Sequence, residues 1–97
     1  MSRVKIIYDN EDAGNLVKRA LLAEKKRLEL GLAKTEREIK GFEERYQVSS
    51  EIFLKEFSAE DLAGGDEEYV HWAGELKLRD RIVQRLEKLE GVEYVAH

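Results

Sequence analysis

A run of apolar residues at alternating three- and four-residue spacing constrains this chain more than any other feature. The run interleaves two seven-residue series in the manner of an a/d seam: Leu21, Leu28, Thr35 and Phe42, and Leu32, Ile39 and Tyr46. No proline interrupts it, and residues of high helix propensity fill most other positions. The pattern predicts one helix over residues 11–46, about 50 Å long. Such a helix requires the rest of the chain, or another chain, along its seam.

The segments around this helix predict further short elements. Alternating side chains predict a short strand and turn in residues 1–10. Residues 49–63 predict a short helical segment, capped by Ser49 or Ser50. Residues 66–90 predict a third helix capped by Asp66, and residues 91–97 a tail or short strand. We expect the inward stripe of the third helix to comprise Tyr69, Trp72, Leu76, Val83, Leu86 and Leu89, with Ile82 beside it.

Together these elements predict a mainly α, single helical domain over residues 1–97. It is an antiparallel helical hairpin with a short middle helix, short terminal β-strands and coiled-coil-like packing. The hairpin brings the terminal strands to the same end, where we expect them to run in opposite directions. A two-stranded ribbon is marginal alone, so helices or a second subunit must support it. Trp72 should be buried near Ile39, Phe42 or Tyr46.

The N-terminal half of the long helix carries a second apolar stripe, broken only by Arg27. The stripe consists of Leu16, Ala20, Ala23 and Leu30. A hairpin needs one apolar face per helix, so a second face predicts another contact. We expect these four residues to form a protein interface, most simply in a two-fold homodimer. The alternative is that the N-terminal strand covers the stripe within one chain, through Val4 and Ile6.

Charge and composition narrow the class of protein. The formal charge of −4 argues against nucleic-acid binding. A basic cluster at Lys18, Arg19 and residues 25–27 is interpreted as a solvated helix face. The absence of cysteine and proline, with abundant Lys, Glu and Arg, is typical of a thermophile's cytoplasmic protein. No apolar run approaches the roughly 20 residues of a membrane span, so we expect a soluble, cytoplasmic protein without a signal peptide.

The side chains indicate no catalytic, cofactor-binding or metal site. Without cysteine, thiol catalysis and thiolate metal sites are excluded. Gly64 and Gly65 follow no strand and lack the lysine of a phosphate loop. Glu67, His71 and Glu75 share one helix face, but the outer carboxylates would lie about 12 Å apart. We therefore expect His71 to be a surface histidine, no metal to matter, and the protein not to be an enzyme.

Two motifs around the end of the long helix carry a family resemblance. They are Glu43–Phe53 (EERYQVSSEIF) with Phe57, and Asp66–Trp72 (DEEYVHW). They resemble small helical proteins of archaea and bacteria, many encoded beside type II toxin genes. This sequence has Gln47 where the family usually has glycine, and Ile52 where the family often has a second acidic residue. The resemblance spans roughly residues 35–78 and implies an antitoxin-like module that binds a toxin-like protein. The alternative is a structural, self-associating helical protein.

Overall fold

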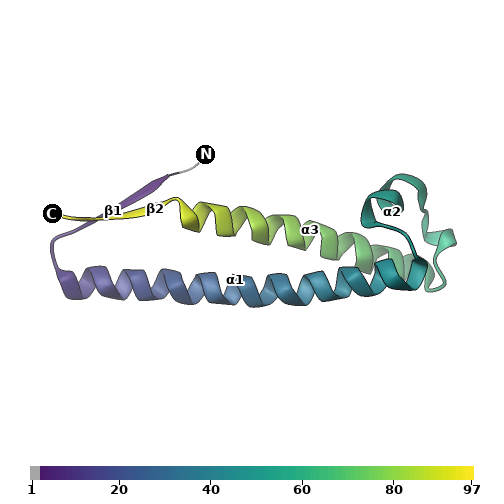
Figure 1. Cartoon of the computed structure of the whole chain (residues 1–97), viewed down its shortest axis with the longest axis horizontal. Coiled ribbons are helices and arrows are strands. Elements are labelled where there is room, and N and C mark those ends of the chain that lie inside the picture. Colours follow the sequence, from purple (N-terminus) through teal and green to yellow (C-terminus); the bar gives the residue numbers. More distant parts are fainter. Residues whose placement is uncertain (1–2) are drawn as a thin grey trace.

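The computed structural model describes residues 3–97, which form a long helical hairpin with a two-stranded ribbon at its open end (Figure 1). The elements in chain order are β1 (Val4–Tyr8), α1 (Glu11–Tyr46), α2 (Ser50–Glu56), a 3-10 turn (Ala59–Asp61), α3 (Gly65–Glu90) and β2 (Val92–Ala96). α1 and α3 lie side by side along a molecule 59 Å long. The predicted mainly α hairpin with a short middle helix and terminal strands is confirmed.

Local chemistry at both ends of α1 explains its limits. At the start, the Asn10 side chain accepts a hydrogen bond from the backbone N–H of Ala13, at 3.0 Å. At the end, Gln47 adopts a left-handed conformation with φ 55° and ψ 38°, which glycine adopts most readily. The side-chain amide of Gln47 donates a hydrogen bond to the backbone carbonyl of Glu44 at 2.6 Å. This bond helps a residue other than glycine to form the corner.

The predicted seam of α1 is the face that packs against α3. Its buried members are Leu28, Thr35, Ile39 and Phe42, and its half-buried members are Leu21, Leu32 and Tyr46. α3 buries Trp72, Leu76 and Ile82 against it. The placement of Val83 in this stripe was wrong, because Val83 is 37% exposed. From Leu76 the contact line advances in two steps of three residues, through half-buried Arg79 to Ile82.

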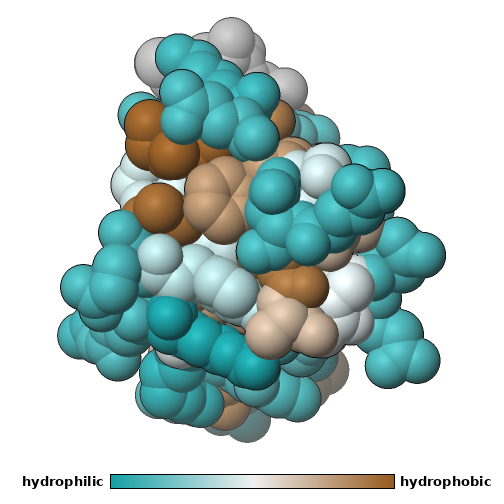
Figure 2. Space-filling view, turned by 90° about the vertical axis from the view of Figure 1, so that its right-hand side faces the viewer, coloured by the Kyte–Doolittle hydropathy of each residue, from teal (hydrophilic) through white to brown (hydrophobic). Residues whose placement is uncertain are grey.

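The core is densest where α1, α2 and α3 meet, at what we call the corner end. Trp72 is fully buried and stacks on Phe53 of α2, with ring centroids 3.9 Å apart. Phe42 and Tyr46 of α1 stack on the same indole at 5.3 and 5.9 Å. The predicted burial of Trp72 is confirmed, with Phe53 as an additional neighbour. Seen from outside, this end shows hydrophobic residues scattered among hydrophilic ones (Figure 2).

The two strands pair in parallel, so the predicted opposite directions were wrong. Val4 lies against Val92, and Tyr8 lies against Ala96. The chain reverses between β1 and α1, so β1 runs back along α1, whereas β2 continues in the direction of α3 (Figure 1). Because α1 and α3 are antiparallel, this reversal makes the strands run the same way.

The reversal between β1 and α1 depends on Gly14. The ring of Tyr8 lies directly over this buried residue, and a Cβ atom there would be 2.6 Å from Tyr8 Cδ2. No side-chain carbon fits at that distance. The glycine therefore allows β1 to fold back onto the first turns of α1.

Candidate functional site

The candidate functional site lies at the end opposite the aromatic core, which we call the strand end. It comprises β1, β2, the first half of α1 and the last turns of α3 (Figure 1). Here the two-stranded ribbon takes the place that α2 has at the opposite end, and large apolar side chains remain exposed.

The second apolar stripe lies outside the hairpin. Leu16 and Leu30 are 64% and 61% exposed, and Ala20 and Ala23 are exposed as well. β1 packs over Gly14 on the seam side of α1, and Leu16 lies more than half a helical turn further round. The alternative in which the N-terminal strand covers the stripe is therefore wrong.

Two more apolar residues of α1 are exposed beside the predicted interface. Leu22 is 64% exposed and Val17 is 38% exposed. Neither follows the 3.5-residue spacing of the second apolar stripe, so the periodicity gave no reason to include them. They widen the uncovered apolar surface of the first half of α1.

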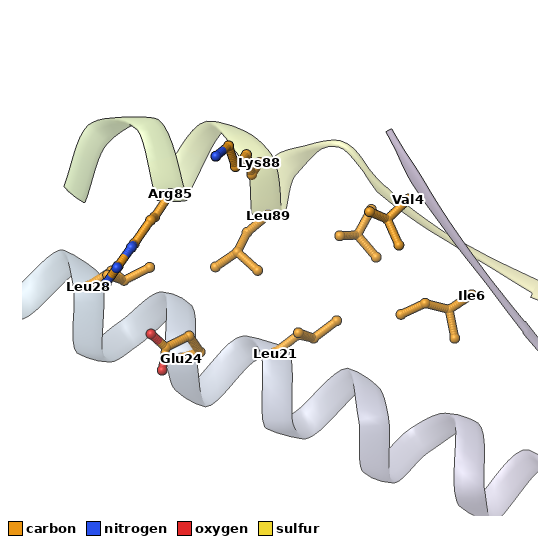
Figure 3. A pocket seen from close by; sticks show the side chains of 9 residues that line it. Val4, Ile6, Leu21, Glu24, Leu28, Arg85, Lys88 and Leu89 are labelled. Carbon is orange, nitrogen blue, oxygen red and sulfur yellow. The ribbon is translucent and has the colours of Figure 1, made fainter. Parts of the chain in front are cut away.

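A hollow of about 360 Å³ separates the ribbon from the two long helices (Figure 3). Its walls are aliphatic side chains from four elements: Val4, Ile6, Leu21, Leu28, Leu89 and Val92. Glu24, Arg85 and Lys88 also line it. Seam periodicity places Leu21 and Leu28 toward α3. Seam periodicity does not specify the position of the ribbon relative to Leu21 and Leu28, so the hollow was not predicted.

One charged residue of the hollow, Glu24, forms a well-defined ion pair with Arg27, which lies outside the lining of the hollow. Arg27 donates from Nε to Glu24 Oε2 at 3.0 Å, and its Nη2 also contacts the carboxylate. This hydrogen bond lowers the pKa of the Glu24 carboxyl, and the charges of Arg27 and Arg85 lower it further. The same hydrogen bond raises the pKa of Arg27. An apolar centre with fixed charges around it is the usual composition of a protein-binding surface.

Two lysines of the basic cluster of α1, Lys18 and Lys25, are partly buried at the strand end. Lys18 Nζ lies 5.4 Å from the ring centroid of Tyr8 and 5.2 Å from that of Tyr94, within the range of cation–π attraction. Lys18 and Lys25 are half-buried because they continue the seam toward the start of the helix. The solvated-face interpretation is therefore wrong for these two lysines, while the rest of the cluster is exposed.

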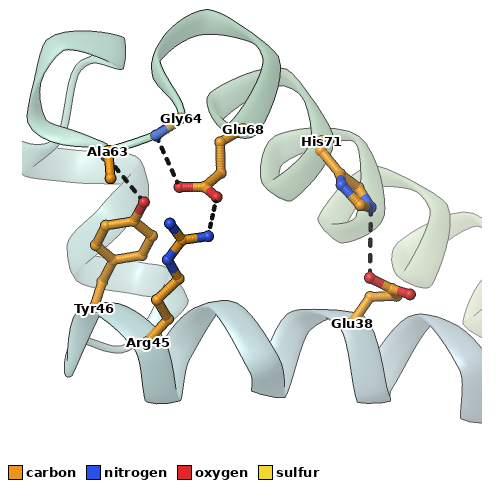
Figure 4. A network of polar contacts seen from close by, with 7 residues as sticks. All are labelled: Glu38, Arg45, Tyr46, Ala63, Gly64, Glu68 and His71. Atoms are coloured by element: carbon orange, nitrogen blue, oxygen red, sulfur yellow. Dashed lines mark hydrogen bonds and ion pairs between the residues drawn. The ribbon is translucent and has the colours of Figure 1, made fainter.

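His71 lies at the corner end, away from the apolar surfaces described above. Its Nε2 atom is 3.6 Å from Glu38 of α1 and 3.7 Å from Glu75 of α3, and Figure 4 shows the contact with Glu38. Of the predicted face, Glu75 reaches His71, whereas Glu67 forms no ion pair with it in the described structure. Within residues 3–97, no group of three or more His, Asp or Glu residues is arranged to hold a metal ion.

Polar contacts close the corner end (Figure 4). Arg45 of α1 donates to Glu68 of α3 at 2.6 Å, and the other Glu68 oxygen accepts from Gly64 N–H at 3.4 Å. The Tyr46 hydroxyl accepts from Ala63 N–H at 3.0 Å. α3 begins at Gly65 without a side-chain cap, so the predicted cap by Asp66 was wrong. Glu68 fixes the start of this helix instead.

The side chain of Ser50 joins all three helices at the corner end. Trp72 Nε1 donates to Ser50 Oγ at 3.0 Å. Ser50 Oγ and its backbone N–H each donate to Glu43 Oε2 at 2.8 Å. Across residues 3–97, every buried side-chain nitrogen and oxygen has a hydrogen-bond partner. The polar groups of the corner core are therefore paired, although Leu54 and Val70 on its surface are 55% and 67% exposed.

Comparisons with protein-family models, curated proteins and solved structures find no match. None of the helices within residues 3–97 has the length and apolarity to cross a membrane. The resemblance to antitoxin-like proteins stays a prediction.

Proposed function

We propose that this chain is a non-enzymatic protein-binding module that contacts its partner through the second apolar stripe. The observation that carries the proposal is the exposure of Leu16 and Leu30, both above 60%, on a helix whose other face is packed. Extended exposed apolar surface on a folded protein marks an interaction site. The corner end holds α1 rigidly, so the first half of α1 is presented as a preformed surface.

The stripe alone supplies part of the binding free energy. Burying each of Leu16 and Leu30 contributes about 1.5–3 kcal/mol. Association costs an estimated 4–15 kcal/mol or more in lost translational and rotational freedom. A stable complex therefore requires further contacts, and Leu22 and Val17, exposed on the two flanks of the stripe, can contribute to them.

An antitoxin-like role in the cytoplasm, with a toxin-like protein as partner, is our more specific proposal. It draws on the resemblance of residues 35–78 to small proteins encoded beside type II toxin genes. Those residues build the corner end, including Trp72 and the Gln47 turn. The resemblance therefore supports a shared scaffold, and the second apolar stripe outside it supplies the contact surface.

Co-expression with the product of the adjacent gene tests this proposal. We expect the wild-type chain to retain that protein during purification and the double variant Leu16→Glu/Leu30→Glu to lose it. The matched control is Ile52→Glu/Leu54→Glu, which places the same charges on α2 residues that are 39% and 55% exposed. Retention by the stripe variant, or loss by the control alone, would contradict the proposed contact surface.

A second candidate function is structural self-association through the same stripe. It is favoured because the second apolar stripe can meet its own copy across a two-fold axis, giving a coiled-coil-like pair of α1 helices. Sedimentation equilibrium tests it: under this candidate function the wild type is a homodimer that Leu16→Glu/Leu30→Glu dissociates. A monomeric wild type at high micromolar concentration contradicts this candidate, as does a dimer that survives both substitutions.

A further inference from the structure

The free edge of β1 presents unpaired backbone groups at exposed residues. Val4 N–H donates to the carbonyl of Gly91, and the carbonyl of Tyr8 accepts from His97 N–H. These bonds direct the backbones of Val4 and Tyr8 toward β2. Because successive residues of a strand alternate in direction, Lys5 and Ile7 direct their N–H and C=O groups to the free edge. Both residues are exposed, Ile7 to 61%.

The free edge of β2 carries different side chains. By the same alternation its outward backbone groups belong to Val92, Tyr94 and Ala96. The side chains of Val92 and Tyr94 face the helices, with Val92 lining the hollow and Tyr94 lying beside Lys18. The charged residues near each edge therefore decide which strand is the better partner for a second copy.

We propose that β1 pairs with β1 of a second copy of this chain, joining two ribbons into one four-stranded sheet. A two-stranded sheet is marginally stable by itself, and three or more strands are normally required. A two-fold axis normal to the sheet makes the two β1 strands antiparallel and self-complementary. Main-chain pairing at an open edge is an established mode of protein association.

Charged residues in β1 and immediately beside its two ends favour its own copy as the occupant. With Ile6 on the two-fold axis, Arg3 lies opposite Asp9 of the other copy. With Ile7 on the axis, Lys5 lies opposite Asp9. Each register repeats its opposite-charge pair by symmetry, and such cross-strand pairs are stabilising. Pairing of β2 with itself about Tyr94 provides no such pair, because Glu93 then lies opposite Val95.

This interface is separate from the second apolar stripe, so it does not depend on the proposed function. Edge pairing uses backbone groups of β1, whereas the stripe faces away from the ribbon. A chain dimerised through β1 would keep the stripe free for another protein. It is also a rival to the stripe-mediated homodimer, and the two interfaces respond to different substitutions.

Proline substitutions at the two edges test the proposal by sedimentation equilibrium. Ile7→Pro removes an N–H group that faces the free edge and leaves the bonds to β2 intact, as proline at an edge strand can. Ala96→Pro is the matched control at the free edge of β2. We expect Ile7→Pro to weaken dimerisation on the order of tenfold or more, and Ala96→Pro and Leu16→Glu/Leu30→Glu to leave it unchanged. A monomeric wild type, or an Ile7→Pro variant as dimeric as wild type, overturns the proposal.

Amide hydrogen exchange on the wild type gives a readout that requires no variant to fold. We expect the N–H groups of Lys5 and Ile7 to exchange slowly at high protein concentration and rapidly after dilution. Those of Tyr94 and Ala96 should exchange rapidly at both concentrations. Equal exchange of the Ile7 N–H at the two concentrations overturns the proposal.

Charge reversal gives a further test of the pairing. Arg3 already lies 3.9 Å from Glu93 of β2 in its own chain, so the informative pair is Lys5 and Asp9 in the register centred on Ile7. Asp9→Lys should weaken the dimer, and adding Lys5→Glu should restore it. Failure of the double variant to recover would contradict this register.

Discussion

The two ends of this hairpin differ in the element that packs against α1 and α3. At the corner end, α2 contacts α1 through Ser50 and Glu43 and contacts α3 through the stack of Phe53 on Trp72. At the strand end, a ribbon of two five-residue strands takes the place of that helix, and a hollow of about 360 Å³ remains beneath it. Packing α1 against α3 buries only one face of each helix. The cover of the remaining apolar residues at each end therefore depends on a third element, which is α2 at one end and the ribbon at the other. The buried aromatic core therefore lies at the corner end, and the hollow lies at the strand end.

The largest expected effect is truncation of the corner-end core. Trp72→Ala should destabilise the protein by about 3–5 kcal/mol, the usual cost of removing a buried Trp. Leu21→Ala at the strand end should cost less, because Leu21 is half-buried and already borders the hollow. Denaturant unfolding of both variants measures the difference. Equal losses would mean that the strand end is as well packed as the corner end.

The next effect isolates the hydrogen bond at the centre of the corner. Ser50→Ala leaves the Trp72 indole N–H buried without its acceptor, which should cost about 1–3 kcal/mol. A double-mutant cycle with Trp72→Phe is the control, since phenylalanine has no N–H to satisfy. We expect Ser50→Ala to cost less in the Trp72→Phe background, as measured by denaturant unfolding. An unchanged cost would assign the effect to the bond between Ser50 and Glu43 instead.

Features that depend on local periodicity were predictable, and those that depend on distant contacts were not. Seven-residue spacing was enough to predict α1 and its seam. The charges of Lys18 and Lys25 concealed that these two residues extend the seam beneath the ribbon. Strand direction depends on the contact of Tyr8 with Gly14, which no spacing rule contains. The free edge of β1 follows from that direction, so it also required the structure.

The comparison of the two ends extends to two glycines of α1, Gly41 near the corner end and Gly14 at the strand end. Alanine is more favourable than glycine inside a helix by about 1 kcal/mol, and a Cβ at Gly41 would meet nothing within 4 Å. Gly41→Ala should therefore raise the melting temperature. Gly14→Ala should lower it, because the Tyr8 ring must move away from a Cβ at 2.6 Å. Similar increases for both variants would show that the ribbon yields without cost.

The smallest effect concerns the ion pair beside the hollow. The pKa of Glu24 lies below its ordinary value of 4.5, chiefly because of the hydrogen bond from Arg27. A depressed folded-state pKa contributes stability above the unfolded-state pKa, and this contribution is lost as the pH falls through the folded-state value. Arg27→Ala should raise the pKa of Glu24 toward 4.5, as followed by NMR titration. It should also slightly reduce stability near neutral pH but not in strong acid. Arg85 provides the remaining electrostatic attraction from α3. If the pKa of Glu24 stayed fully depressed in Arg27→Ala, Arg85 would be holding the carboxylate across the hollow, and the strand end would be more closed than its exposed leucines indicate.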